Sequence, residues 1–183
     1  MKLSVRLLVF TALSSALTAV GAFLKISIPP YPVPMTLQTF FVFMAGMLLP
    51  PKAAFLSQAV YITLGLLGVP VFAGGGGIGY ILHPTFGYLL AFLACAPLIS
   101  LLTRKFRVNG KSLRFYGLSL LIIAGTGLIG VLYMAAIYAI HIGTPLTISY
   151  AVYMFLIFIP PDAVKFMLCV LISGKIRKVI GAL

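Results

Sequence analysis

Six long apolar runs, joined by short connections, constrain how this chain of 183 residues can fold. Hydrophobic residues make up 62% of the chain, charged residues make up 8%, and the mean hydropathy is +1.21. This composition lies far from that of soluble globular domains and is typical of an integral membrane protein. The runs are continuous and not alternating, which excludes a β-barrel and leaves helices as the spanning structure. The runs cover residues 3–24, 36–49, 53–72, 85–103, 116–142 and 148–174.

The sequence therefore predicts an all-α membrane protein whose residues 1–183 form a single transmembrane domain of six helices. Run 36–49 is short for a full crossing, so we expect its helix to begin within the preceding connection. The first run has a second interpretation, because Lys2, Arg6 and the small residues 20–22 are also features of a cleavable signal peptide. We favour a retained span, since the apolar stretch is long for a signal peptide and five further runs follow.

Basic residues gather on alternate connections between the runs. With the N-terminus inside, eleven of the thirteen lysines and arginines fall on one side of the membrane. The positive-inside rule then predicts that both termini are cytoplasmic. It also accounts for the net charge of +12, so no nucleic-acid partner is expected. The eleven residues are Lys2, Arg6, Lys52, Arg104, Lys105, Arg107, Lys111, Arg114, Lys175, Arg177 and Lys178.

The last apolar run contains Asp162, the only acidic residue of the chain, and also Lys165. Three residues apart, the two side chains share one face of a helix. A charge at membrane depth is costly and usually faces a partner, a cavity or a ligand. Pro160 and Pro161 predict a break in the run, with a helix restarting near Pro161 and Asp162 in its first turn. We therefore expect Asp162 and Lys165 to be functional.

Two connections on the outer side are rich in proline and glycine. Segment 28–34 contains four prolines, which favour a stiff extended chain. Segment 73–80 contains five glycines, which can expose backbone N–H groups and allow a ligand to approach closely. Irregular backbone at this depth is tolerated where it is buried in protein or lines a cavity. The segments therefore indicate a lidded site open to the outside, and two ordinary loops remain the alternative.

Several other motifs are better explained by a structural role than by a catalytic or binding role. Segment 125–130 matches GxGxxG, but it lies mid-run without a preceding strand, so small residues for helix packing are the better interpretation. No P-loop pattern is present in the sequence. His83 and His141 offer too few ligands for a metal site, and no nucleophile pairs with a base, so an enzyme is not expected. Cys95 and Cys169 lie in apolar runs and are predicted to be buried free thiols.

Amides and small residues within the runs are candidates for contacts between helices. Gln38 and Gln58 are expected to form interhelical hydrogen bonds, and Gln38 is also a candidate ligand contact because it follows the proline segment. A stripe of small residues on the first run lets another helix approach closely. That helix can belong to this bundle or to another membrane subunit, and the sequence leaves both possibilities open. The stripe consists of Ala12, Ser15, Ala16, Ala19 and Ala22.

Four segments together resemble the BioY family, whose members are biotin-binding S components of energy-coupling-factor (ECF) transporters. The resemblance implies a six-helix S-component bundle in the cell membrane, with both termini cytoplasmic. It further implies that the chain captures biotin from outside for ATP-driven uptake, with biotin as transported ligand and no cofactor. The segments are Tyr31-Pro-Val-Pro-Met-Thr-Leu-Gln38, Gly68-Val-Pro-Val-Phe-Ala-Gly-Gly-Gly-Gly-Ile-Gly-Tyr80, His83-Pro-Thr-Phe-Gly-Tyr88 and Pro161-Asp-Ala-Val-Lys165.

The resemblance also implies roles for particular residues. Ala12 and Ala16 match the family's Ala-x-x-x-Ala element, which docks the transmembrane coupling subunit that two ATPase subunits drive. His83 departs from the family, where glycine is more usual, and is expected to crowd the edge of the pocket. The implied biotin contacts, lid and wall are Asp162, Lys165, Gly74, Gly75, Gly76, Gly77, Tyr80, Gln38 and Tyr31.

Biotin's chemistry is consistent with these residues. Asp162 can accept hydrogen bonds from the ureido N–H groups, and Lys165 can donate to a ligand oxygen. The sequence does not assign which end of biotin meets which residue. Two alternatives stay open: an S component for another vitamin, and a stand-alone secondary transporter that couples to protons through Asp162. An inverted repeat would favour the second alternative, and no convincing one is evident in the sequence.

Overall fold

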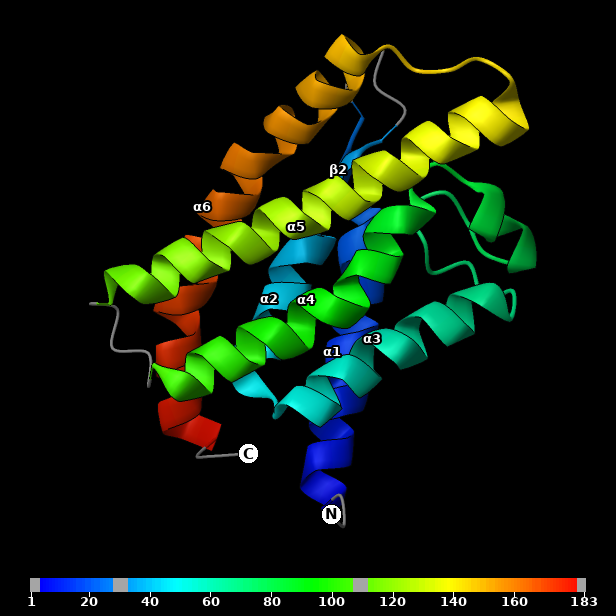
Figure 1. The fold of residues 1–183 in the computed structure, drawn as a ribbon. Helices are drawn as coiled ribbons and strands as arrows, with labels where there is room; N and C mark the ends of the chain where they lie inside the picture. The colour runs from blue at the N-terminus through cyan, green and yellow to red at the C-terminus, as the bar shows by residue number, and fades with distance from the viewer. Residues whose placement is uncertain (1–3, 28–32, 107–111, 181–183) are drawn as a thin grey trace.

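The computed structural model describes residues 4–27, 33–106 and 112–180. Across these ranges the chain is mostly helical, and its one sheet is an antiparallel pairing of Lys25 with Thr36 and Ile26 with Met35 (Figure 1). The elements are α1 (Val5–Phe23), β1 (Lys25–Ile26), β2 (Met35–Thr36), α2 (Gln38–Leu48), α3 (Pro51–Leu66), the 3₁₀ turn η1 (Ile78–Leu82), α4 (Phe86–Lys105), α5 (Leu113–Ile137), the π-helical turn η2 (Tyr138–Ile142) and α6 (Ile148–Ile180).

Four helical segments within the described ranges are long and apolar enough to cross a membrane. They are Val5–Phe23, Phe86–Lys105, Leu113–Ile142 and Ile148–Val179. The predicted helical membrane protein is thus confirmed, and the chain is a multi-pass membrane protein. Helices α2 and α3, with 11 and 16 residues, are shorter than the roughly 20 residues that a span usually needs. Length and composition therefore support four of the six predicted crossings.

Local sequence signals set several helix ends. Ser4 caps α1 by accepting a hydrogen bond from the Leu7 N–H at 3.2 Å, and Ser112 caps α5 in the same way. Pro51 lies in the first turn of α3, where its missing N–H has no cost. The π-helical turn η2 ends at Gly143, whose φ of 77° suits glycine. These signals set where α1, α3 and α5 begin and where η2 ends.

Helix α6 corrects one prediction, because it runs without interruption from Ile148 to Ile180. Pro160 and Pro161 lie inside it, so the predicted break and restart are wrong, and Asp162 is not in a first turn. A proline removes one N–H and crowds the carbonyl of the preceding turn, but membrane helices tolerate it by bending. Figure 1 shows the upper, orange part of α6 and its lower, red part pointing in different directions.

Close packing holds the bundle around α4, which contacts α2, α3 and α5. Gly46 allows α2 to approach α4 closely: a Cβ at this position would lie 2.6 Å from the Ala96 carbonyl oxygen. The rings of Phe43 and Phe166 add an edge-to-face contact between α2 and α6, with centroids 5.6 Å apart. The predicted burial of the two free cysteines is confirmed. The core thus follows the membrane pattern in which small residues let helices meet.

Both termini lie at the same end of the bundle, whereas the α5–α6 connection and the β1–β2 pair lie toward the opposite end (Figure 1). The guanidinium of Arg177, in the last turn of α6, donates to the Met47 carbonyl oxygen near the end of α2. This contact joins the two helices at the end that carries the termini. The chain therefore reverses direction at the opposite end, once between α1 and α2 and again between α5 and α6.

The packing of Gly46 predicts a sharp response to one methyl group. We expect Gly46→Ala to lower stability by about 1 to 3 kcal/mol, because the methyl cannot fit against Ala96 and Ile99 without moving a helix. Gly117→Ala in α5 is the matched control: its Cβ meets nothing within 4 Å, so it should be neutral or slightly stabilising. Thermal unfolding in detergent can be followed with a thiol-reactive dye, since Cys95 and Cys169 are buried. Equal melting temperatures for the two variants would contradict the packing argument.

Candidate functional site

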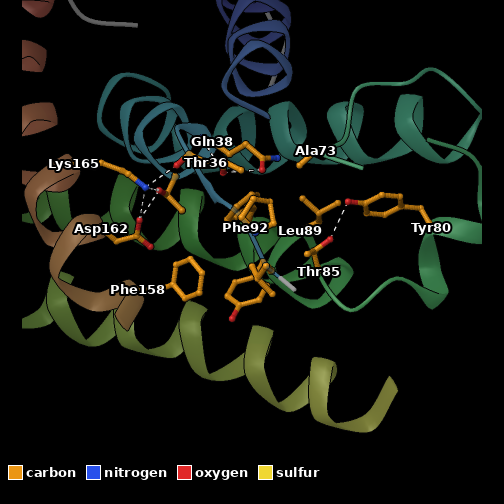
Figure 2. A pocket seen from close by; sticks show the side chains of 14 residues that line it. Thr36, Gln38, Ala73, Tyr80, Thr85, Leu89, Phe92, Phe158, Asp162 and Lys165 are labelled. Carbon is orange, nitrogen blue, oxygen red and sulfur yellow. Dashed lines mark hydrogen bonds and ion pairs between the residues drawn. The ribbon is translucent and has the colours of Figure 1, made fainter. Parts of the chain in front are cut away.

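A cavity opens between the β2–α2 junction, α4 and α6, with η1 at one side (Figure 2). Its wall combines polar groups with aromatic and aliphatic side chains, as ligand pockets generally do. Asp162 and Lys165 lie at one end of the view, and Tyr80 and Thr85 lie at the other (Figure 2). The lining residues are Val33, Pro34, Thr36, Gln38, Thr39, Ala73, Tyr80, Thr85, Tyr88, Leu89, Phe92, Phe158, Asp162 and Lys165.

Asp162 and Lys165 form an ion pair at the α6 end of the cavity. The Lys165 Nζ lies 2.9 Å from Asp162 Oδ1, and the side chains are only 16% and 14% exposed. The ammonium also donates to the Thr36 carbonyl oxygen at 2.7 Å and to Thr39 Oγ1 at 3.0 Å. Its three protons therefore each have an acceptor. Desolvated charges need such complete pairing, because an unpaired one is expensive.

Thr39 links this pair to α2. Its hydroxyl donates to Asp162 Oδ1 at 2.7 Å while it accepts from Lys165. Both hydrogen bonds to Asp162 within the described residues use Oδ1, which leaves Oδ2 as an acceptor for another donor. The three-residue spacing in a continuous helix brings Asp162 and Lys165 together, as the sequence predicts.

Gln38 lies beside Thr39 and connects the cavity to α3. Its Nε2 donates to the Tyr61 hydroxyl at 2.7 Å, and Tyr61 donates in turn to the Val71 carbonyl oxygen at 3.1 Å. The predicted interhelical hydrogen bond of Gln38 is confirmed, and this residue also lines the cavity. Gln58 instead donates to its neighbour Ser57, and its Oε1 has no partner within the described residues.

Tyr80, Thr85 and His83 form the other polar end. The Tyr80 hydroxyl and the Thr85 hydroxyl are 2.9 Å apart, and the His83 ring stacks on the Tyr80 ring with centroids 4.7 Å apart. Thr85 N–H donates to His83 Nδ1 at 3.3 Å, so this nitrogen is the acceptor. Burial lowers the pKa of His83, which favours the neutral imidazole. His83 contacts both Tyr80 and Thr85 but is not among the residues that line the cavity.

The glycine segment packs as a turn. Gly75 and Gly77 have φ values of 120° and 99°, and their N–H groups donate to the carbonyl oxygens of Phe72 and Gly65. Phe72 is buried against Gly65, where a Cβ would lie 2.0 Å from its ring. Two N–H groups predicted to face a ligand are thus used within the chain. Gly74, Gly75, Gly76 and Gly77 are not among the lining residues, and their role as ligand contacts stays a prediction.

The other predicted site residues are placed as follows. Asp162, Lys165, Gln38 and Tyr80 line the cavity together, although 124 positions separate Gln38 from Asp162 in the sequence. Tyr31 lies outside the described residues. On α1, Ser15 and Ala22 are buried within the bundle, whereas Ala12 and Ala16 are exposed. The small-residue stripe is therefore divided between internal packing and an outer face.

Sequence reasoning predicted no ligand contact at four of the lining residues, although the resembling segment 83–88 contains two of them. The four are Thr39, Thr85, Tyr88 and Phe158. Phe158 lies four residues before Asp162, and Tyr88 lies three residues after Thr85, so helical spacing could have indicated both. No sequence pattern indicated Thr39, because its role depends on where α6 crosses α2. No group of three or more histidine, cysteine or acidic residues that could hold a metal ion occurs in the part of the chain that the structure describes.

Comparisons with known proteins agree with one another. The BioY family model matches residues 1–182. The biotin transporter BioY of Thermotoga maritima is 33% identical over 179 residues, which are 94% of this chain and 96% of that protein. A probable biotin transporter BioY of Lysinibacillus sphaericus is 58% identical over 92 residues, and in that match this chain spans about half (46%) of the relative's length.

A solved structure has the same fold. The crystal structure of the S-component for biotin from an ECF-type ABC transporter aligns with a TM-score of 0.78 and 30% sequence identity. The alignment covers 95% of this chain and 92% of that chain. The similarity therefore extends over the whole bundle, including the helices that form the cavity.

The bonds of Thr39 predict a specific stability loss. We expect Thr39→Val to destabilise the chain by about 2 kcal/mol, because it removes the hydrogen bonds with Asp162 and Lys165 while keeping the side chain's shape. Thr11→Val is the matched control, since the buried Thr11 hydroxyl donates to the Leu7 carbonyl of its own helix, at 2.7 Å. The thiol-dye melting assay checks both variants. If they melt alike, the network does not stabilise the α2–α6 contact.

Proposed function

The chain belongs to the BioY family, and from this premise we propose that it is the membrane-embedded subunit that captures biotin for uptake. The cavity between α2, α4 and α6 is the proposed binding site. The observation that carries this proposal is the ion-paired Asp162 and Lys165 at one end of a partly apolar cavity. The chain acts as a transporter component and not as an enzyme.

The lining of the cavity matches the chemistry of biotin. Biotin has ureido N–H donors, a ureido oxygen, an apolar thioether ring and a carboxylate tail. The Asp162 carboxylate is the acceptor proposed for the N–H groups, through the oxygen Oδ2 that Thr39 and Lys165 do not use. Leu89 and Phe92 are the apolar surface proposed for the ring, and the hydroxyls of Tyr80 and Thr85 are the polar surface proposed for the far end of the ligand.

We further propose six membrane-embedded segments with both termini in the cytoplasm. The common end of the two termini (Figure 1) and the distribution of the basic residues support this orientation. It places the β1–β2 pair on the outer side. Helices α2 and α3 would then cross as short helices extended by the connections that pack on them. Biotin would enter from this outer side.

Transport requires partners in this proposal. The sequence has no P-loop pattern, so ATP hydrolysis would come from separate ATPase subunits. Ala12 and Ala16 are exposed on one face of α1 and lie four residues apart, which lets a partner helix approach closely. This face is the proposed docking site for the ECF transmembrane coupling subunit. No resident cofactor is part of the proposal.

Binding of biotin to the purified chain tests the site. We expect Asp162→Asn and Lys165→Ala each to weaken binding by about tenfold to a hundredfold, since each removes a charge-assisted hydrogen bond or its support. Lys175→Ala, an exposed lysine on the same helix, is the control and should bind normally. Labelled biotin in equilibrium binding, with thiamine and riboflavin as competitors, gives the readout.

Four outcomes would change the proposal. A folded chain that binds no biotin would refute it, and stronger competition by another vitamin would change the ligand. Normal binding by both Asp162→Asn and Lys165→Ala would move the site elsewhere. Uptake by cells that is abolished by an uncoupler, and that needs no ATPase, would instead support a proton-coupled transporter.

The exposed face of α1 gives a separate prediction. We expect Ala12→Leu combined with Ala16→Leu to abolish co-purification with the coupling subunit and uptake by cells, while biotin binding by the isolated chain stays unchanged. The added side chains would keep the partner helix away. Ala136→Leu, at an alanine of α5 that is also exposed, is the control. Normal assembly of the double variant would exclude this face as the docking site.

A further inference from the structure

The Tyr88 hydroxyl is buried at the cavity without a hydrogen-bond partner among the described residues. Three other side-chain atoms share this property, in Gln58, Thr103 and Ser119, but none of those residues lines the cavity. Leaving a buried hydroxyl unpaired is costly. A group of this kind is satisfied when a ligand with a suitable acceptor enters. Tyr88 therefore adds an open hydroxyl to the cavity wall, as Asp162 adds its unused Oδ2.

Tyr88 projects from α4 toward the end of the cavity formed by α6. Its ring lies against the Phe158 ring, with centroids 5.8 Å apart, and Phe158 is one helical turn before Asp162. Leu89 and Phe92 of the same α4 face also line the cavity, as does Thr85, the residue just before α4. The open hydroxyl thus belongs to the same ligand-facing surface as Asp162.

Gly130 of α5 makes room for this ring. A Cβ at residue 130 would lie 2.4 Å from Cδ1 and Cε1 of Tyr88 and 2.5 Å from its Cζ. These distances are too short for any side chain, and the contact is with the middle of a rigid ring. Gly125 in the same helix has nothing within 4 Å of its Cβ position. Only the last glycine of segment 125–130 is therefore required by the packing of Tyr88.

We propose that Tyr88 determines ligand specificity by donating a hydrogen bond to a ligand oxygen beside Asp162, and that Gly130 positions its ring. The proposal rests on the proposed function. In a cyclic urea the carbonyl oxygen is adjacent to both N–H groups, so an N–H held by Asp162 Oδ2 brings that oxygen near Tyr88. The ligand class is a compound in which an N–H donor and a carbonyl oxygen belong to one amide or urea group.

The Tyr88→Phe variant separates this role from a structural one. It should bind biotin about tenfold more weakly, which is about 1.4 kcal/mol. Without ligand it should melt at the same or a higher temperature than the native chain, because it loses a hydroxyl that had no partner. A lower melting temperature without ligand would show that the hydroxyl serves the fold, and that result would overturn the proposal.

Gly130→Ala tests the positioning. It should weaken biotin binding by about tenfold or more by displacing the ring, whereas Gly125→Ala should bind normally. In a Tyr88→Ala background, Gly130→Ala should cause no further loss, because the ring that it displaces is gone. Additive losses in that background would show that Gly130 acts on another part of the cavity.

The native chain in detergent, titrated with biotin, serves as the reference for every variant. If the folded native chain binds no biotin, the proposed function fails and this inference fails with it. If the native chain binds biotin and Tyr88→Phe binds equally well, the proposed function stands and only the role of Tyr88 is refuted. Weaker binding with undiminished stability supports both.

Discussion

The hydrogen-bonded ion pair of Asp162 and Lys165 is the interaction on which the arrangement of the cavity depends. Neither charge can be left unpaired in apolar surroundings, so the chain supplies Thr39 and the Thr36 carbonyl as further partners. These partners come from β2 and α2, more than 120 residues earlier in the sequence. The ion pair thus holds α6 against the β2–α2 junction, and the cavity lies beside this contact.

Glycine sets how closely the other helices approach. At Gly46 the backbone of α4 fills the space of a side chain, and at Gly130 the ring of Tyr88 does so. The same principle folds the connection after α3, where Phe72 packs on Gly65. In a membrane, where hydrophobic burial gives helices little reason to prefer one another over lipid, such close contacts supply much of the specificity of packing. The glycines of this chain therefore serve the cavity mostly by shaping its walls.

The two polar ends of the cavity differ in how they are built. At the α6 end the groups are charged and already paired, apart from Oδ2 of Asp162 and the Tyr88 hydroxyl within the described residues. At the η1 end the groups are neutral, with the hydroxyls of Tyr80 and Thr85 bonded to each other and supported by His83. An elongated ligand with a polar group at each end and an apolar middle suits this distribution.

The sequence by itself determined the helical membrane fold, the shared helix face of Asp162 and Lys165, and the burial of the cysteines. Those conclusions follow from hydropathy, helical spacing and the cost of charge in lipid, which are local properties of the chain. Sequence reasoning wrongly predicted a helix break at Pro160 and Pro161, because a helix held by its neighbours can bend where an isolated helix would break. Only the tertiary structure could decide that Thr39 joins the ion pair, that two glycine N–H groups turn inward, and that Tyr88 keeps an open hydroxyl. Each depends on which helix crosses which, and that is fixed by packing between residues far apart in the sequence.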